Sequence, residues 1–135
     1  MATNNKKTYS GTYSGRWKSK VYPDINGLFT LTIGSDSDPE PIKSELKLVY
    51  NVNSKYKPGK EINIQFEGFF KSDEWYDRYM FRQPNLKHEQ YFTMTISNGP
   101  VRQSPFGLVG QKVLRGFVSC IFPQDCVQLS NFKKE

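Results

Sequence analysis

Alternation of apolar and polar residues runs through most of the chain and limits its possible folds more than any other feature. Ile62, Ile64 and Phe66 alternate with Asn63, Gln65 and Glu67. Between residues 9 and 21 one face is aromatic or small and the other is polar and cationic. Successive side chains of a strand point to opposite faces of a sheet, so this period of two predicts half-buried β-strands.

Eight stretches carry the strand pattern. They are residues 9–21, 28–33, 42–52, 62–70, 75–82, 91–97, 112–122 and 127–132. Asn-Gly, Asp-Pro and Pro-Gly pairs, which favour turns, separate several of them. Alanine, the best helix former, occurs once in the 135 residues, which excludes a helical bundle. We therefore predict an all-β, single-domain antiparallel meander that closes into a barrel, with a β-sandwich as the alternative.

The predicted barrel domain occupies residues 9–135. Residues 1–8 are polar, and we expect them to form a disordered tail. The stretch from Pro100 to Gly110 is the longest irregular segment and is predicted to be a mobile loop. No apolar run approaches the roughly 20 residues of a membrane-spanning helix. Lys6 and Lys7 are not followed by the apolar stretch of a secretory signal, so a cytoplasmic location is expected.

The start of the first predicted strand carries a Gly-x-Trp motif, Gly15-Arg16-Trp17, followed by the strand pattern at residues 27–33. This opening resembles that of the calycin barrels, the group of lipocalins and avidins, in which the Trp closes one end of the barrel. The resemblance implies a closed barrel with Trp17 as a structural closure residue. It also implies that Arg115 packs across Trp17, as a late Arg does in lipocalins.

Cys120 and Cys126 flank a predicted hairpin turn. If the turn uses five residues, the two cysteines face each other and could form a disulfide, whereas in a reducing cytosol two partly buried thiols are the commoner outcome. Two cysteines and the single histidine, His88, do not complete a Cys/His zinc site. We predict neither a metal nor a cofactor.

Motifs for catalysis are missing from the sequence. It contains no Gly-x-Ser-x-Gly elbow, no phosphate-binding glycine loop and no metalloprotease helix. Asp73 and Glu74 lie beside aromatic residues, as glycoside chemistry would require, but acidic residues are also ordinary at the start of a strand. We therefore predict a protein without catalytic activity.

The leading functional prediction is a β-barrel that binds a small apolar ligand or a partner protein through aromatic residues. The Phe69-Phe70 and Trp75-Tyr76 pairs place aromatic side chains at successive positions, which is more than one core face explains. The predicted recognition residues are Phe70, Trp75, Tyr76 and Tyr79.

A different class of function is also compatible with the sequence. The net charge is +6, and cations alternate or mix with aromatic residues along predicted strands, a combination that suits single-stranded nucleic acid. The residues for this alternative are Arg16, Lys18, Lys20, Arg78 and Arg82. Equally, the lysines could serve solubility while the aromatic residues fill the core. A structural or assembly protein is the third possibility.

Overall fold

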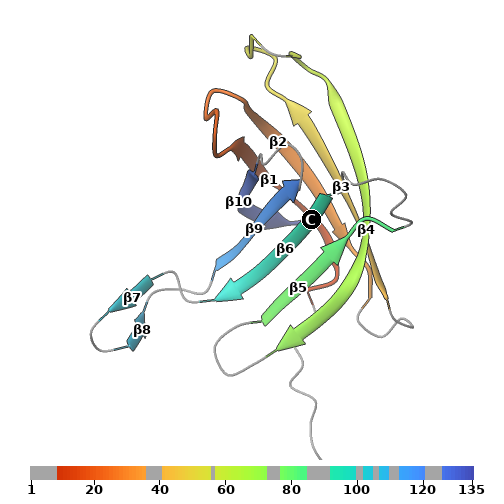
Figure 1. Ribbon diagram of the computed structural model, residues 1–135, viewed down its shortest axis with the longest axis vertical. Coiled ribbons are helices and arrows are strands. Elements are labelled where there is room, and N and C mark those ends of the chain that lie inside the picture. Colours follow the sequence, from red (N-terminus) through yellow and green to blue (C-terminus); the bar gives the residue numbers. More distant parts are fainter. Residues whose placement is uncertain are drawn as a thin grey trace, which may run out of the picture.

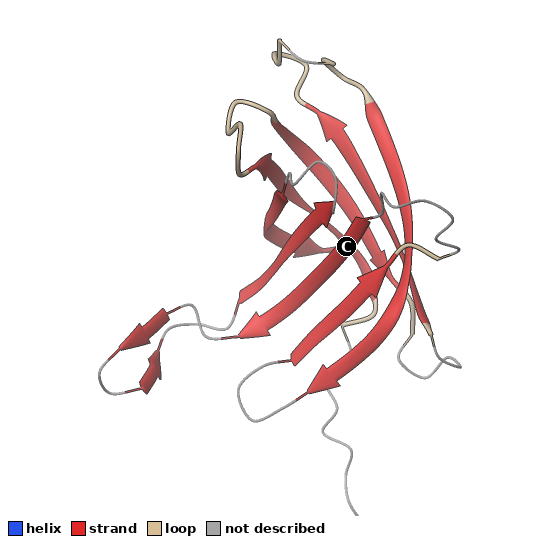
Figure 2. Ribbon diagram, in the orientation of Figure 1, coloured by secondary structure: helices blue, strands red, loops and turns tan. Residues whose placement is uncertain are grey.

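The fold is known from a computed structural model, which describes residues 9–35, 41–55, 57–72, 77–84, 92–99, 102–104, 107–109, 113–120 and 126–135. Its strands are β1 (Gly11–Ser19), β2 (Asn26–Ile33), β3 (Ile42–Tyr50), β4 (Glu61–Ser72), β5 (Asp77–Arg82), β6 (Phe92–Gly99), β7 (Arg102–Ser104), β8 (Gly107–Val109), β9 (Val113–Cys120) and β10 (Cys126–Lys134). Figure 2 shows strands and loops but no helix over these ranges. Nothing in them could therefore cross a membrane as a long apolar helix.

Eight of the strands close into an antiparallel barrel with the order β1-β10-β9-β6-β5-β4-β3-β2 (Figure 1). Each strand pairs with the barrel strands that precede and follow it in the chain, and β10 pairs back onto β1. Closure leaves none of the eight as an unpaired sheet edge. The predicted all-β closed meander is thus confirmed, and the sandwich alternative is not adopted.

The predicted strands agree with the barrel strands to within two residues at every end. The segment from Pro100 to Gly110, predicted to be a mobile loop, instead contains the hairpin of β7 and β8, in which Arg102 pairs with Val109. In Figure 1 this hairpin projects from the end of the barrel where β6 finishes and β9 begins. Strands of three residues are too short to show alternation, so the sequence does not reveal them, and the predicted mobility of the segment stays a prediction. Residues 1–8, the predicted tail, lie outside the described residues.

Large side chains fill the interior of the barrel. Tyr79, Phe29 and Phe66 are among the largest fully buried residues. The ring of Tyr79 stacks on Phe81 at 5.4 Å between centroids. A methyl group added at Gly116 would lie 2.5 Å from the Ile96 Cδ1 atom, so even this glycine has no spare volume beside it. The inward face is therefore close-packed core, as expected for a small barrel that fills itself with side chains.

Trp17 lies in this core near the end of β1, with 3% of its surface exposed. Its Nε1–H donates to the Val49 carbonyl at 3.1 Å, and its ring meets Tyr50 edge-on at 5.1 Å. Arg115 does not share this environment. Its neighbours on β9, Leu114 and Gly116, face the interior, so Arg115 lies on the outer surface beside Ser97 of β6. The prediction that Arg115 packs across Trp17 is therefore wrong.

Tyr9 lies just before β1, at the end of the barrel opposite to Trp17. Its hydroxyl donates to the Asp77 carboxylate at 2.6 Å and accepts from the Asn98 Nδ2–H at 2.7 Å. Its carbonyl accepts a hydrogen bond from the Tyr13 hydroxyl, and its ring contacts Phe70. Because Asp77 and Asn98 belong to β5 and β6, these contacts connect β1 to strands on the far side of the barrel.

Burial and the hydrogen bond to the Asp77 carboxylate raise the pKa of Tyr9 to about 12. Both effects disfavour the phenolate, the first by desolvation and the second because the neutral hydroxyl is the donor. The folded protein therefore holds Tyr9 in its neutral form.

Candidate functional site

The outer surface of β4, β5, β6 and β9 carries the most distinctive arrangement of side chains among the described residues. We call this surface the β4–β9 face. On β5, Tyr79 and Phe81 are buried, so the residues that alternate with them, Arg78, Met80 and Arg82, point outward. The same alternation applies to the neighbouring strands, and the outward side chains of all four form one surface.

Strand register aligns these side chains into three rows that cross the four strands. The first row consists of Lys71, Arg78, Ser97 and Arg115. The second consists of Phe69, Met80, Thr95 and Phe117. The third consists of Glu67, Arg82, Thr93 and Ser119. Neighbouring strands lie about 4.8 Å apart, so each row spans roughly 14 Å.

Positive charge is concentrated in the first row, which holds Lys71, Arg78 and Arg115, whereas in the third row Arg82 lies opposite Glu67. The other side of the barrel, formed by β2, β3 and the first half of β4, is mixed. There Lys43 and Glu45 alternate, and Lys47 forms an ion pair with Glu61 at 3.5 Å. The β4–β9 face therefore carries more positive charge, and a more positive potential, than the side formed by β2, β3 and the first half of β4.

The second row exposes apolar surface between the cations. Phe69 is 50% exposed and Met80, directly opposite on β5, is 42% exposed. Phe117 is half-buried, and the Lys20 ammonium lies 5.1 Å from its ring centroid, within cation–π range. Beside Phe69 and Met80 the surface is hollowed by a depression of about 410 Å³. The face thus combines the rings of Phe69 and Phe117, the Met80 thioether and a surface depression with several neighbouring cations.

The cations predicted for nucleic-acid binding are distributed over two regions. Arg78 and Arg82 lie on the β4–β9 face, and Lys20 extends it through its contact with Phe117. Lys18 continues the second row, because it pairs with Gln128, which in turn pairs with Phe117. Arg16 lies farther around the barrel, on the β1 surface next to β2.

Of the predicted recognition aromatics, the two that the structure describes, Phe70 and Tyr79, are not exposed. Tyr79 is 1% exposed and belongs to the core, and Phe70 packs against that core beside Tyr9. Trp75 and Tyr76 lie outside the described residues. On β4 the exposed aromatic residue is the neighbouring Phe69, which could have been recognised because it falls among the polar, outward-facing positions of that strand.

Phe117 is the residue of β9 in the second row of the β4–β9 face. Gly116 and Val118 are its buried neighbours, so Phe117 points outward. Its role in the second row, like that of Met80, is missed by reasoning from sequence.

The pairing of β9 with β10 fixes the backbone register next to the two cysteines. β9 and β10 pair with Cys126 opposite Ser119, one position away from the register in which the five-residue turn would bring Cys120 and Cys126 together. The possible disulfide between Cys120 and Cys126 stays a prediction. Within the described ranges no three His, Cys, Asp or Glu side chains gather as metal ligands.

No protein-family description, curated protein or solved structure matches this chain.

Proposed function

We propose that this chain is a non-enzymatic binding protein that holds single-stranded nucleic acid on the β4–β9 face. The observation that carries the proposal is the row of exposed Phe69 and Met80 and half-buried Phe117, which lies beside the cations of the first row and next to Arg82. Unpaired bases can stack on aromatic rings while the phosphates contact Lys and Arg. Release of counterions from the phosphates then contributes much of the affinity.

The packing of the barrel favours this proposal over an internal apolar ligand. The interior holds close-packed rings, and a methyl group at Gly116 or Gly15 would already collide with Ile96 or Phe29. The exposed apolar row also favours a single strand over a duplex, because the bases of a duplex are stacked on one another and cannot lie flat on protein rings.

The proposal includes a calycin-like relationship for the barrel. It is supported by the eight-stranded closed meander and by the buried Trp17 that follows Gly15 and Arg16. The outward position of Arg115 departs from the lipocalin pattern. A cytoplasmic location stays a prediction.

Fluorescence anisotropy with a labelled oligothymidine of about 12 nucleotides, within the site sizes of single-strand binders, tests the proposal. The logarithm of the association constant should fall with the logarithm of salt concentration by about 0.7 for each phosphate neutralised. The Lys71→Gln/Arg82→Gln variant removes two cations of the face and should make that slope shallower by about 1.4.

The matched control is Lys43→Gln/Lys60→Gln, which removes the same charge from exposed positions away from the face. It should leave the slope near that of the wild type. Equal effects of the two double variants would overturn the proposal, as would the absence of binding at low salt. Poly-glutamate binding as tightly as the oligonucleotide would instead assign the face to an acidic protein partner.

A further inference from the structure

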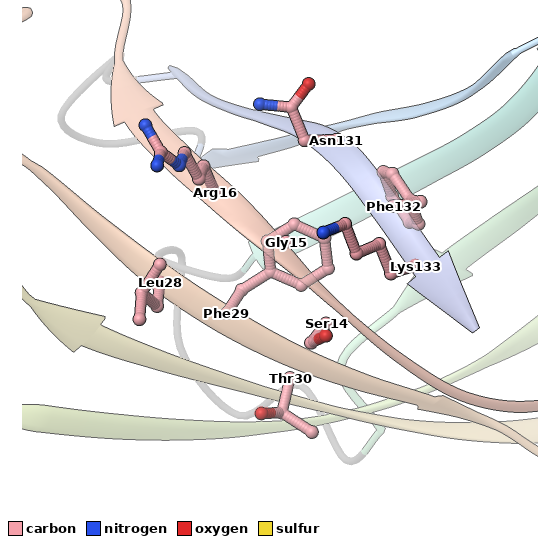
Figure 3. Close-up of a pocket in the computed structure, with 9 residues that line it drawn as sticks. All are labelled: Ser14, Gly15, Arg16, Leu28, Phe29, Thr30, Asn131, Phe132 and Lys133. Carbon is pink, nitrogen blue, oxygen red and sulfur yellow. The ribbon is translucent and has the colours of Figure 1, made fainter. Parts of the chain in front are cut away.

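A second surface depression, of about 590 Å³, lies where β1 is flanked by β2 and β10 (Figure 3). It is formed at a β-bulge, because the β1–β10 register shifts between Ser14 and Arg16. Asn131 occupies the bulge with a φ of 57°, a left-handed conformation that Asn tolerates better than most residues. The extra residue bends β10 and opens the surface at this point.

Polar side chains from three strands form the rim of this depression. Ser14 of β1 lies directly between Thr30 of β2 and Lys133 of β10. Arg16 is the next outward residue of β1, and Asn131 projects from the bulge (Figure 3). The rim thus combines two cations, two hydroxyls and one amide.

These rim groups are not used by the fold. Within the described residues, Arg16 and Lys133 take part in no ion pair, in contrast to the Lys47–Glu61 pair on β3 and β4. The side chains of Ser14 and Thr30 likewise form no hydrogen bond to another described residue. Their donors are therefore directed to solvent or to a bound molecule, and both charges remain uncompensated.

Leu28 and Phe132 form the apolar wall of the depression, and the Phe29 ring is buried beneath it. The Phe29 ring lies directly under Gly15, where an added Cβ would approach its Cε2 atom to 2.5 Å, and it meets Phe132 at 4.9 Å between centroids. Leu28, 61% exposed, stands at the side next to Arg16. A ligand seated here meets cations and hydroxyls at the rim and the apolar surface of Leu28 and Phe132 beside them.

We propose that this depression binds a small aromatic phosphomonoester. The Arg16 guanidinium can hold two phosphate oxygens at once, and the Lys133 ammonium adds a second charge opposite the dianion. The hydroxyls of Ser14 and Thr30 supply further donors, which suits three terminal oxygens better than the two of a carboxylate. The aromatic group lies against Leu28 and the half-buried Phe132, and the volume of the depression is in the range of small-molecule sites.

Isothermal titration with phenyl phosphate, inorganic phosphate and benzoate tests the assignment. Phenyl phosphate should bind saturably and more tightly than either of the other two. Arg16→Gln and Lys133→Gln should each weaken it about tenfold, the lower end of the range for hydrogen bonds to charged groups. Lys43→Gln is the matched control on β3 and should change nothing. A thermal melt of each variant verifies that the barrel stays folded.

This site is independent of the β4–β9 face, so the two proposals fail separately. Lys71→Gln/Arg82→Gln should lose oligonucleotide affinity and keep phenyl phosphate binding. The assignment is overturned if phenyl phosphate does not saturate, if Arg16→Gln and Lys133→Gln bind it as the wild type does, or if Lys43→Gln weakens it equally. Equal affinity for phenyl phosphate and inorganic phosphate would remove the aromatic part of the proposal.

Discussion

Replacing Tyr9 by Phe tests how much the hydrogen bonds of the Tyr9 hydroxyl contribute to the stability of the barrel. The variant keeps the ring that packs on Phe70 and removes the hydroxyl. That hydroxyl donates to Asp77 at 2.6 Å and accepts from Asn98 at 2.7 Å, so both strand partners lose a hydrogen bond. Bonds of this kind contribute about 1 kcal/mol each, more where one partner is charged. Asp77 has further interactions and Tyr9 is half-buried, so we expect a loss of about 1–2 kcal/mol in unfolding free energy.

The effect of the variant should depend on pH, with a sign set by the raised pKa of about 12. The ordinary pKa of a tyrosine is about 10. The folded state therefore binds the phenolic proton more tightly than the unfolded state. The stability that Tyr9 contributes is complete below about pH 10 and declines as the pH rises towards 12. The stability difference between wild type and Tyr9→Phe should shrink over this window.

Urea unfolding of both proteins at several pH values between about 8 and 12 measures that difference, since other alkaline titrations cancel between them. Tyr22→Phe, at an exposed tyrosine, is the control and should match the wild type throughout. A Tyr9→Phe variant as stable as the wild type at pH 8 would refute the reasoning. A difference that stayed constant up to pH 12 would refute the assigned protonation state.

Three further outcomes are expected. Trp17→Phe leaves the Val49 carbonyl without its indole donor and should lower the unfolding free energy by about 1–3 kcal/mol in urea titration; a loss under about 0.5 kcal/mol would contradict the contact. Gly116→Ala should lower the unfolding free energy by a similar amount of about 1–3 kcal/mol, because the added methyl group overpacks against Ile96. In the double variant, Ile96→Val should recover part of this loss, whereas strictly additive effects of the two substitutions would argue against the contact. Phe69→Ser should cost about 1–3 kcal/mol of oligonucleotide affinity in anisotropy titrations with the melting temperature unchanged, whereas unaltered affinity would exclude stacking on this ring.

The barrel strands could be predicted because each has one face in a common core. In β4, Ile64 and Phe66 are buried while Gln65 between them is exposed, and the alternation of apolar and polar residue types predicts this difference in burial. Closure was likewise predictable from eight such strands in succession. The hairpin of β7 and β8 was not, since its short strands offer no period to detect.

The site was predictable only in part, because it depends on strand register. Arg78 and Arg82 follow from alternation on β5, but their alignment with Lys71 and Arg115 requires the pairing of four strands. The direction of Phe117 is ambiguous in sequence, since both phases of β9 contain apolar residues.

The bulge is a second feature that the pattern of residue types does not reveal. At Asn131 it shifts the phase of β10, and with it the side chains around the second depression.

The central claim is that single-stranded nucleic acid lies on the β4–β9 face, and mapping backbone amide shifts by NMR during an oligothymidine titration tests it most directly. We predict shifts that saturate together and concentrate around Phe69, Met80 and Phe117, with Lys43 and Glu45 on the opposite side unaffected. Saturating shifts confined to β2 and β3, or no shifts at low salt, would contradict the account.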